Sequence, residues 1–316
     1  MIYEQTLRQS VSCKGVGLHS GAPVELRILP AEAGTGIVFR RVDLDGFEVE
    51  ATGRNVARVS YATSLMKKGV LISTTEHLLS AIIGVGVDNA LVELDNLELP
   101  ILDGSAQPFV EMVRQAGLRR QRRKRTYLRM KREVELRDGD KFIGVYPATG
   151  YSVSYRINFA HPLIGREAFE VELCPEGCHE ALSAETGTNP YCREIAPART
   201  FGFLHEAEAM RNMGLIRGAS ADSVIVLTRD GIQNPPLRFT DEFVRHKVLD
   251  LIGDLALVGK RIIGRVVADR AGHAMHTALV SRLLKDRSLC EEVTGDELAA
   301  GESTAVPTPA HASRHA

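Results

Sequence analysis

The sequence predicts an α+β fold of two similar domains, each a β-sheet covered by helices. In each half, short apolar or alternating runs broken by turn residues come first, and amphipathic helices follow them. The two halves also contain similar sequence segments. EHLLSAIIGVGVDNALVEL (76–94) and RHKVLDLIGDLALVGKRIIGRVVA (245–268) share an order of a polar pair with His, an apolar helix, a glycine and a strand. Such an internal similarity indicates a duplicated unit, whose two copies could face each other across a cleft.

The composition is that of a soluble globular protein. The 316 residues are enough for two domains, and the 44% hydrophobic and 25% charged residues are ordinary values. The net charge of -1 gives no global reason to bind nucleic acid or an anionic membrane. No apolar run is long enough to cross a bilayer, and the first residues lack a signal peptide's apolar segment. We therefore expect a cytoplasmic monomer with no nucleic-acid partner and no stable membrane insertion.

The first half is predicted to contain a sheet, a glycine-rich turn and a well-formed helix. Residues 73–84, STTEHLLSAIIG, fit a helix with one apolar side and with Ser73 or Thr74 as its cap. The turn GVGLHSG (15–21) carries His19, which either lines a site or belongs to a plain turn.

A basic run, RRQRRKR, marks the predicted domain boundary. No aromatic residues interleave with it, so a charged, exposed linker is favoured over a phosphate-binding surface. Small and polar residues predominate from about residue 291, which is typical of a disordered tail. The predicted organisation is a first domain over 1–118, a linker over 119–126, a second domain over 127–290 and a tail over 291–316.

The helix predicted over 241–254, DEFVRHKVLDLIGD, carries the strongest chemical signal. Its apolar residues share one face, whereas His246, Asp250 and Asp254 recur every four residues on another, with Lys247 beside them. A His and an Asp four residues apart can aim at one metal ion. The same stripe can also be a solvated face with i,i+4 ion pairs, and this segment alone leaves both interpretations open.

An adjacent Glu76–His77 pair lies in the first turn of the earlier helix. In zinc hydrolases such a His binds the metal and the Glu handles the proton of the attacking water. His77 with His246 and Asp250 would supply two nitrogens and one oxygen, the number of protein ligands of a catalytic zinc with an open fourth position. The residues whose types suit an oxyanion donor or an acid for the leaving group are Thr200, Lys247 and His273.

Several separated motifs together resemble one family. They are GVGLHSG, STTEHLLSA, PILDGSAQPFV, ARTFGF, FTDEFVRHKVLDLIGDL and GHA, spread in that order between about Ile2 and Leu284. The set is similar to the UDP-3-O-acyl-N-acetylglucosamine deacetylases, zinc amidases of lipid A biosynthesis in Gram-negative bacteria. The resemblance implies a β-α-α-β sandwich with the helices of two α+β domains packed between the sheets. It also implies removal of the N-acetyl group from UDP-3-O-(3-hydroxyacyl)-N-acetylglucosamine, which gives the free amine and acetate in the committed step of that pathway.

The resemblance assigns roles to the residues at the matching positions. The implied ligands of one catalytic zinc ion are His77, His246 and Asp250. Glu76 would be the general base and His273 the general acid, with Asp254 holding and charging the imidazole. Thr200 and Lys247 would stabilise the oxyanion or position the substrate.

Substrate contacts are implied in the same way. A small β insert at about 39–63 and a βαβ-type insert at about 203–226 would flank the site, the second forming an apolar passage for an acyl chain of ten or more carbons. Lys141 and Phe159 match positions near the UDP moiety. The implied substrate-binding residues are His19, Lys141, Phe159, Phe201, Phe203, Ala207, Ile216, Ala221 and Val226.

The sequence departs from the family pattern at three places. Asn158 stands where an acidic residue is common, Ser223 is polar along the implied passage, and the segment 162–197 is longer than usual. That segment contains Cys174, Cys178, His179 and Cys192, residue types that can hold structural zinc, although their spacing is not one of the common patterns. Two rival classes stay open: a non-catalytic protein that binds nucleotide-sugar or nucleic acid through the basic run and the glycine-rich turn, and a zinc peptidase, which the missing second His after His77 disfavours.

Overall fold

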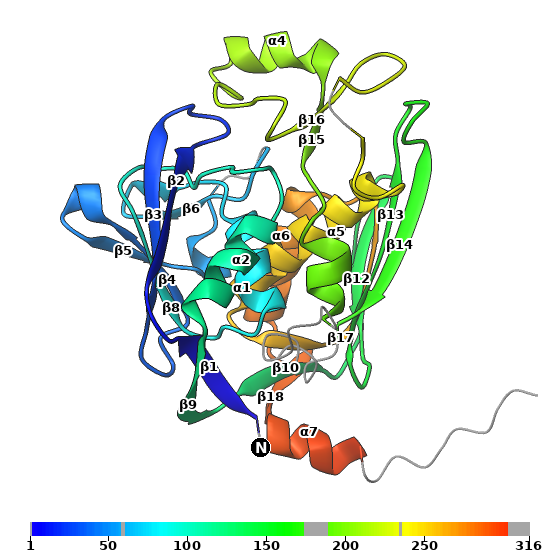
Figure 1. Ribbon diagram of the computed structural model, residues 1–316. Coiled ribbons are helices and arrows are strands. Elements are labelled where there is room, and N and C mark those ends of the chain that lie inside the picture. Colours follow the sequence, from blue (N-terminus) through cyan, green and yellow to red (C-terminus); the bar gives the residue numbers. More distant parts are fainter. Residues whose placement is uncertain (1, 58–60, 174–188, 234–235, 303–316) are drawn as a thin grey trace, which may run out of the picture.

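Two β-sheets enclose a layer of helices (Figure 1). The computed structural model describes residues 2–57, 61–173, 189–233 and 236–302. The helices between the sheets are α1 (Glu76–Gly84), α2 (Gln107–Ala116), α5 (Glu242–Leu255) and α6 (His273–Lys285). The predicted α+β fold of two similar domains is confirmed.

The first sheet has five strands in the order β2-β3-β8-β4-β5. Only the β4–β8 pair is parallel, and the other neighbours are antiparallel. Alternate residues of the central strands point into the core, as in a sheet with one covered face. The strands are β2 (Val11–Val16), β3 (Pro23–Pro30), β4 (Ile37–Arg41), β5 (Phe47–Glu50) and β8 (Ala90–Leu94).

The second sheet repeats this arrangement and extends it. Its strands β11-β12-β17-β13-β14 have the same order and the same single parallel pair, here β13–β17. Two further strands, β10 and β18, continue from β17. The strands are β10 (Thr126–Met130), β11 (Val134–Asp138), β12 (Lys141–Tyr146), β13 (Tyr151–Asn158), β14 (Arg166–Glu172), β17 (Arg261–Asp269) and β18 (Cys290–Thr294).

The similarity between residues 76–94 and 245–268 corresponds to this duplication of the sheets. In the first half α1 leads into the central strand β8, and in the second half α5 leads into the central strand β17. The two corresponding helices, α1 and α5, contact each other in the middle of the molecule. Helices buried between two sheets need apolar residues on almost every side, and α1 has only Ile83 short of full burial.

The smaller elements surround this sandwich. Beyond the two large sheets, the described residues form three two-stranded sheets and several short helical turns. The paired strands are β1 (Tyr3–Leu7) with β9 (Leu118–Lys124), β6 (Leu65–Lys67) with β7 (Val70–Ile72), and β15 (Phe201–Phe203) with β16 (Ile225–Leu227). The remaining helical elements are η1 (Val42–Leu44), η2 (Gly53–Asn55), the π-helix η3 (Tyr191–Ile195), α4 (Leu204–Asn212), η4 (Ala256–Val258) and α7 (Gly295–Glu302).

The basic segment is a strand, not an unpaired linker. Residues of β9 pair antiparallel with β1, which joins the ends of the first half. Arg125, expected to be exposed, is buried because its guanidinium donates to the Asp88 carboxylate at 2.7 Å and to the Gly86 carbonyl at 2.8 Å. A buried cation needs such partners, and the carbonyls that follow the C-terminal end of α1 provide one.

Other predicted boundaries also differ from the structure. The range 39–63 contains β5 and most of β4, which belong to the main sheet, and the separate hairpin β6–β7 follows it. The tail does not begin at 291, because β18 pairs with β10 and α7 follows it. Residues 303–316 lie outside the described part. In the second half, β15, α4 and β16 form a βαβ unit over 201–227.

The predicted cap of the first helix is wrong as well. The helix begins at Glu76 after Thr75, and neither Ser73 nor Thr74 caps it. The Thr74 hydroxyl instead donates to the Glu98 carboxylate at 2.9 Å, and its backbone adopts a positive φ of 60°. Tertiary hydrogen bonds therefore replace the local cap.

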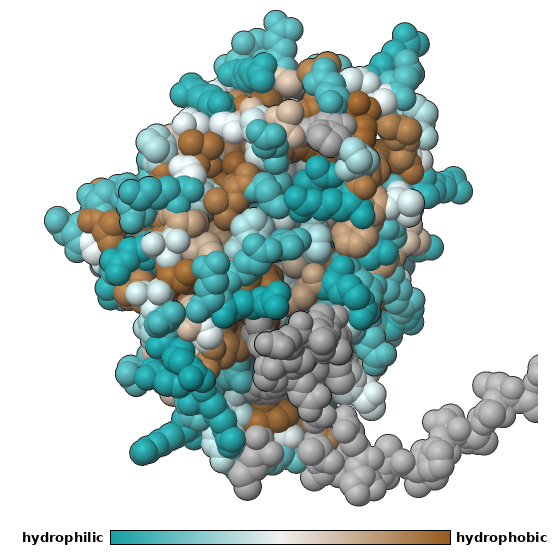
Figure 2. All heavy atoms as spheres, viewed as in Figure 1, coloured by the Kyte–Doolittle hydropathy of each residue, from teal (hydrophilic) through white to brown (hydrophobic). Residues whose placement is uncertain are grey.

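None of the helices formed by the described residues is both long and apolar enough to cross a bilayer. In Figure 2, apolar residues are interspersed with polar ones at the α4 end of the molecule. Leu204 and Met213, at the two ends of α4, are among the exposed large apolar side chains.

The crossing of α1 and α5 requires a glycine. A Cβ placed on Gly253 would collide with the backbone carbonyl of Glu76. We expect Gly253→Ala to lower the free energy of unfolding by about 1–3 kcal/mol, because the two helices must separate. Urea denaturation would measure the change. Gly202→Ala is the matched control, since a Cβ there meets no atom within 4 Å. A Gly253→Ala variant as stable as the wild type would contradict a tight crossing.

Glu167 gives a pH-dependent contribution to stability. Its carboxylate accepts the Val244 N–H of the first turn of α5 at 3.0 Å, and burial raises the pKa of Glu167 from 4.5 to about 7. A raised folded-state pKa means that the folded protein binds the proton more tightly, so this contribution falls as the pH rises from about 4.5 to 7.

We expect Glu167→Gln, which keeps a carbonyl acceptor but cannot ionise, to lose less stability than the wild type between pH 5 and pH 8. Urea denaturation of both proteins at the two pH values measures the difference. Equal losses of stability would show that Glu167 ionises in the folded protein without cost.

Candidate metal centre

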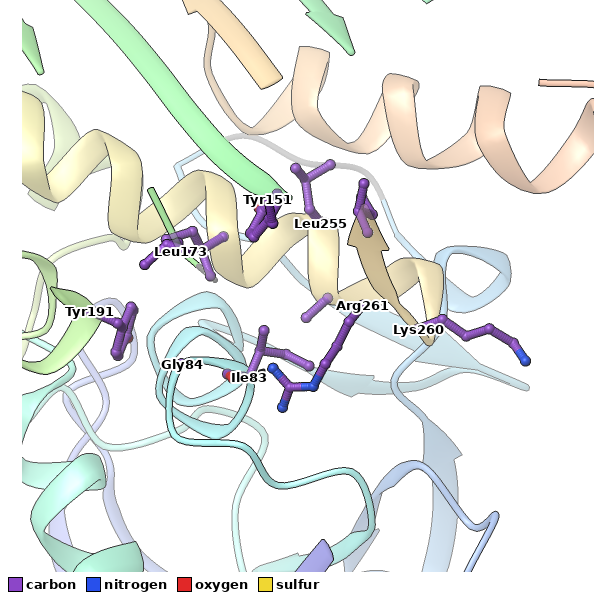
Figure 3. A pocket seen from close by; sticks show the side chains of 11 residues that line it. Ile83, Gly84, Tyr151, Leu173, Tyr191, Leu255, Lys260 and Arg261 are labelled. Atoms are coloured by element: carbon purple, nitrogen blue, oxygen red, sulfur yellow. Dashed lines mark hydrogen bonds between the residues drawn. The ribbon is translucent and has the colours of Figure 1, made fainter. Parts of the chain in front are cut away.

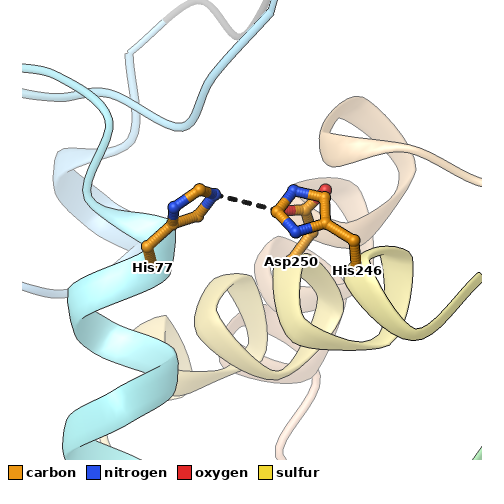
Figure 4. Close-up of side chains that lie close together, drawn as sticks. All are labelled: His77, His246 and Asp250. Carbon is orange, nitrogen blue, oxygen red and sulfur yellow. Dashed lines mark ion pairs between the residues drawn. The ribbon is translucent and has the colours of Figure 1, made fainter. Parts of the chain in front are cut away.

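Three side chains from the two halves meet at one point in the helical layer. His77 comes from the first turn of α1, and His246 and Asp250 come from successive turns of α5 (Figure 4). All three are at most 5% exposed. The stripe on α5 is therefore not a solvated face of ion pairs, which settles the alternative that the sequence left open.

The distances fit one small cation. The Nε2 atoms of His77 and His246 lie 3.7 Å and 3.4 Å from Oδ1 of Asp250, and the two rings are nearly perpendicular at 85°. Ligand atoms about 2.0–2.2 Å from a tetrahedral ion are separated by roughly 3.3–3.6 Å. The three donor atoms can thus hold one metal ion after small adjustments.

Hydrogen bonds and charges prepare these groups as ligands. His246 donates its Nδ1–H to the Ala198 carbonyl at 3.0 Å, which leaves Nε2 free for the site, and burial lowers the pKa of His246 to about 3. Burial alone would raise the pKa of Asp250, but His246, Lys247 and His273 bring it well below its usual value. A neutral imidazole and an ionised carboxylate are the forms that coordinate metals.

Glu76 lies beside the cluster as a buried carboxylate. Its side chain is in the same first turn as His77, and its Oε2 accepts the backbone N–H of Thr63 at 3.1 Å. Burial raises the pKa of Glu76, an effect that His273 and His77 partly offset. A carboxylate with a raised pKa is a better proton acceptor near neutral pH than an ordinary one.

His273 and Asp254 form a second group next to the first. The Nδ1 of His273 donates to Asp254 at 2.8 Å, and its Nε2 faces Asp250 at 3.8 Å. Burial would lower the pKa of His273, but the carboxylates of Asp254 and Asp250 raise it to about 9. The imidazole is therefore cationic at neutral pH and directs a proton towards the cluster.

The segment before β15 is attached to the start of α5. Arg199 donates to the Glu242 carboxylate at 2.9 Å, and Ala198 accepts from His246. Thr200 follows in this segment, and Lys247 donates to Asp250 at 2.8 Å while its Nζ lies 5.6 Å from the centre of the Phe201 ring.

An apolar cavity begins next to the cluster. The Phe201 ring, 6.4 Å from the His246 ring, lies between the cluster and this cavity of about 290 Å³. The βαβ unit supplies most of its walls. The substrate-binding residues expected from the sequence that line it are His19, Phe201, Phe203, Ala207, Ile216, Ala221 and Val226, and Thr200 lines it too.

Other expected substrate residues lie outside the cavity wall. Phe159 packs against the rings of Phe201 and Phe203, with centroids 5.7 Å and 5.9 Å away, so it supports the wall from behind. Lys141 is exposed at the start of β12, whose next residue pairs with Asp269 near the end of β17. Ser223 is buried and hydrogen-bonds to Ser220 instead of lining the passage.

His19 is placed by a buried carboxylate that the sequence did not single out. Glu98 accepts the backbone N–H of His19 at 2.8 Å and that of Ser20 at 2.7 Å. The ring nitrogens of His19 are buried and have no hydrogen-bond partner among the described residues, and burial lowers the pKa of His19. A neutral imidazole with free nitrogens is thus available at the cavity.

Thr63 and His276 were also missed. Both are buried and hydrogen-bond to Asp254, and His276 further contacts the Tyr155 hydroxyl at 3.2 Å. His276 could have been found in the sequence from its position one helical turn after His273. No sequence pattern pointed to Thr63. Of the four residues considered for structural zinc, Cys174, Cys178 and His179 lie outside the described part, and Cys192 is in η3.

A separate apolar pocket lies at the other ends of the two central helices (Figure 3). Its walls include Ile83, Tyr191, Leu255 and Arg261, so it belongs to the C-terminal turns of α1 and α5. None of the candidate ligands or proton-transfer residues lines it.

The fold and the cluster together define a class of protein. Two duplicated α+β halves enclose two imidazoles and a carboxylate, with a further carboxylate and a cationic imidazole within reach. This donor set is typical of metal-dependent hydrolases.

The family is shown by comparison with known proteins. The family model described as UDP-3-O-acyl N-acetylglycosamine deacetylase matches residues 4–285. A protein of Solibacter usitatus named UDP-3-O-acyl-N-acetylglucosamine deacetylase is 51% identical over 95% of this chain and 97% of its own length. Proteins of the same name from Cellvibrio japonicus and Anaeromyxobacter dehalogenans are 42% and 45% identical over 94% and 90% of this chain, and 95% and 88% of their own lengths. The chain belongs to this family of deacetylases, enzymes that act on an amide bond.

Proposed function

We propose that the protein is a zinc-dependent deacetylase. Its substrate would be UDP-3-O-(3-hydroxyacyl)-N-acetylglucosamine, whose N-acetyl group it would hydrolyse to acetate and a free amine in the committed step of lipid A biosynthesis. The observation that carries the proposal is the buried meeting of His77, His246 and Asp250 beside Glu76 in a chain of this family.

The metal site fits zinc by its donor chemistry. Two imidazole nitrogens and one carboxylate oxygen leave one corner of a tetrahedron free. Zinc bound there would lower the pKa of water to about 7 and polarise the amide carbonyl.

The surrounding residues would move the protons. Glu76 would accept the proton of the attacking water, since its carboxylate is adjacent to the cluster and its pKa is raised by burial. His273, cationic at neutral pH, would protonate the amine as the C–N bond breaks. Asp254 holds Nδ1 of that imidazole, so that Nε2 faces the cluster. Thr200 and Lys247 would stabilise the oxyanion or position the substrate.

The cavity would receive the acyl chain. Its walls are formed largely by apolar side chains of the βαβ unit, and it begins at Phe201 next to the cluster. His19, whose ring nitrogens have no hydrogen-bond partner among the described residues, would contact the polar part of the substrate. Phe159 and Lys141 would contact the UDP moiety.

The central experiment measures metal content and acetate release on the same purified protein. His77→Ala and Asp250→Ala should each lose the bound zinc and the release of acetate from acyl-UDP-N-acetylglucosamine, because two remaining ligands hold the ion poorly. His205→Ala is the matched control, since His205 is exposed on α4. Full zinc content or full activity in either ligand variant would contradict the assignment.

Glu76 is tested separately from the metal. Glu76→Gln keeps an acceptor for the Thr63 N–H but cannot take up a proton. Turnover should therefore fall by about 10² or more while the zinc content stays that of the wild type. Unchanged turnover in this variant would exclude Glu76 as the base.

A further inference from the structure

We propose that Thr63 is a positioning residue that holds the candidate base and the candidate acid in register across the boundary between the two halves. The inference rests on the proposed function, because it concerns the same proton-transfer groups. Thr63 belongs to the first half and is fully buried.

One residue contacts both proton-transfer groups. The backbone N–H of Thr63 donates to Oε2 of Glu76 at 3.1 Å, and its hydroxyl donates to Oδ1 of Asp254. The same hydroxyl lies 3.3 Å from Nδ1 of His273. A single rigid amino acid therefore links the carboxylate of α1 to the Asp254–His273 pair of α5 and α6.

The backbone of Thr63 is itself attached to the start of α1. Its carbonyl accepts the backbone N–H of Thr75 at 3.1 Å and the Thr75 hydroxyl at 3.2 Å. Because the N–H and the C=O of Thr63 are both bonded to this one turn, its hydroxyl is presented to the second half in one orientation.

The hydrogen bonds at Asp254 explain why that hydroxyl matters. Oδ2 accepts Nδ1–H from both His273 and His276, each at 2.8 Å. Oδ1 accepts from Thr63, and among the described residues no other hydrogen bond to this atom is found. Loss of the hydroxyl would leave a fully buried carboxylate oxygen unsatisfied. The carboxylate would then be held through Oδ2 alone, so that it and the His273 imidazole can turn about that oxygen.

The arrangement predicts an effect on turnover and not on substrate affinity. Thr63 does not line the apolar cavity, so substrate binding has no need of it. The distance between base and acid does depend on it, and a displacement of about 1 Å can reduce a rate by about 10²-fold.

Two nearly isosteric variants test the proposal. Thr63→Val keeps the shape and removes the hydroxyl, whereas Thr63→Ser keeps the hydroxyl. We expect kcat for acetate release to fall by about 10- to 100-fold in Thr63→Val, with KM and zinc content unchanged, and to stay within about 3-fold of the wild type in Thr63→Ser. Equal kcat in Thr63→Val and wild type, or equal losses in both variants, would overturn the proposal.

A double-mutant cycle that combines Thr63→Val with Asp254→Asn shows whether Thr63 acts through Asp254. In that background Thr63→Val should cause little further loss of kcat, since the carboxylate that it orients is already gone. A full additional loss would overturn the proposal. Should Thr63→Val fail to fold, Thr63→Ala takes its place in the cycle.

A readout without substrate separates this inference from the proposed function. The low-field proton signal of the His273 Nδ1–H, assigned by its disappearance in His273→Gln, should be retained in Thr63→Ser and shift or broaden in Thr63→Val. An unchanged signal in Thr63→Val would overturn the positioning role, whether or not the wild type releases acetate. Absence of acetate release by the wild type, with the expected change of signal, would instead contradict the deacetylase alone.

Discussion

The close crossing of α1 and α5 is the constraint on which the site depends. Gly253 has no side chain, and the backbone of Glu76 lies against it. Glu76 and His77 are the first two residues of α1, whereas His246 and Asp250 lie on α5. Only a crossing at this distance therefore brings the four side chains together. Neither half holds a complete ligand set. The duplication places two equivalent helices against each other, and the functional groups occupy their interface.

Burial of so many polar groups is possible because each carboxylate has donors around it. An isolated charge in this layer would cost several kcal/mol, roughly the whole net stability of a small domain. The charge of Asp250 is offset by Lys247 and the imidazoles around it. The carboxylate of Asp254 accepts hydrogen bonds from His273, His276 and Thr63. The same hydrogen bonds hold the side chains in fixed orientations. Stability and preorganisation of the site are thus achieved by one network.

The elements that would contact substrate are those that the halves do not share. The candidate metal ligands, Glu76 and Asp254 come from the duplicated helices α1 and α5, and His273 is the first residue of α6. The apolar cavity comes mainly from the βαβ unit of the second half, with His19 from a turn of the first half held by Glu98. The duplicated helices therefore supply most of the candidate reactive centre, and segments outside the repeat supply most of the cavity.

Local periodicity in the sequence was sufficient to predict both central helices, the stripe of His246, Asp250 and Asp254, and the duplicated α+β halves, because neighbours along the chain determine which side of a helix or strand is apolar. The same local information led to a linker at 119–126 and a tail from 291, whereas Leu118–Lys124 form β9 and Cys290–Thr294 form β18. Local patterns do not reveal these strands, because a strand's partner lies far away in sequence. Thr63 was invisible for the same reason: its hydroxyl meets a carboxylate 191 positions along the chain. Which buried donors meet which acceptors was decided only by the packing of the two halves, where an unpaired polar group carries a cost that no local pattern records.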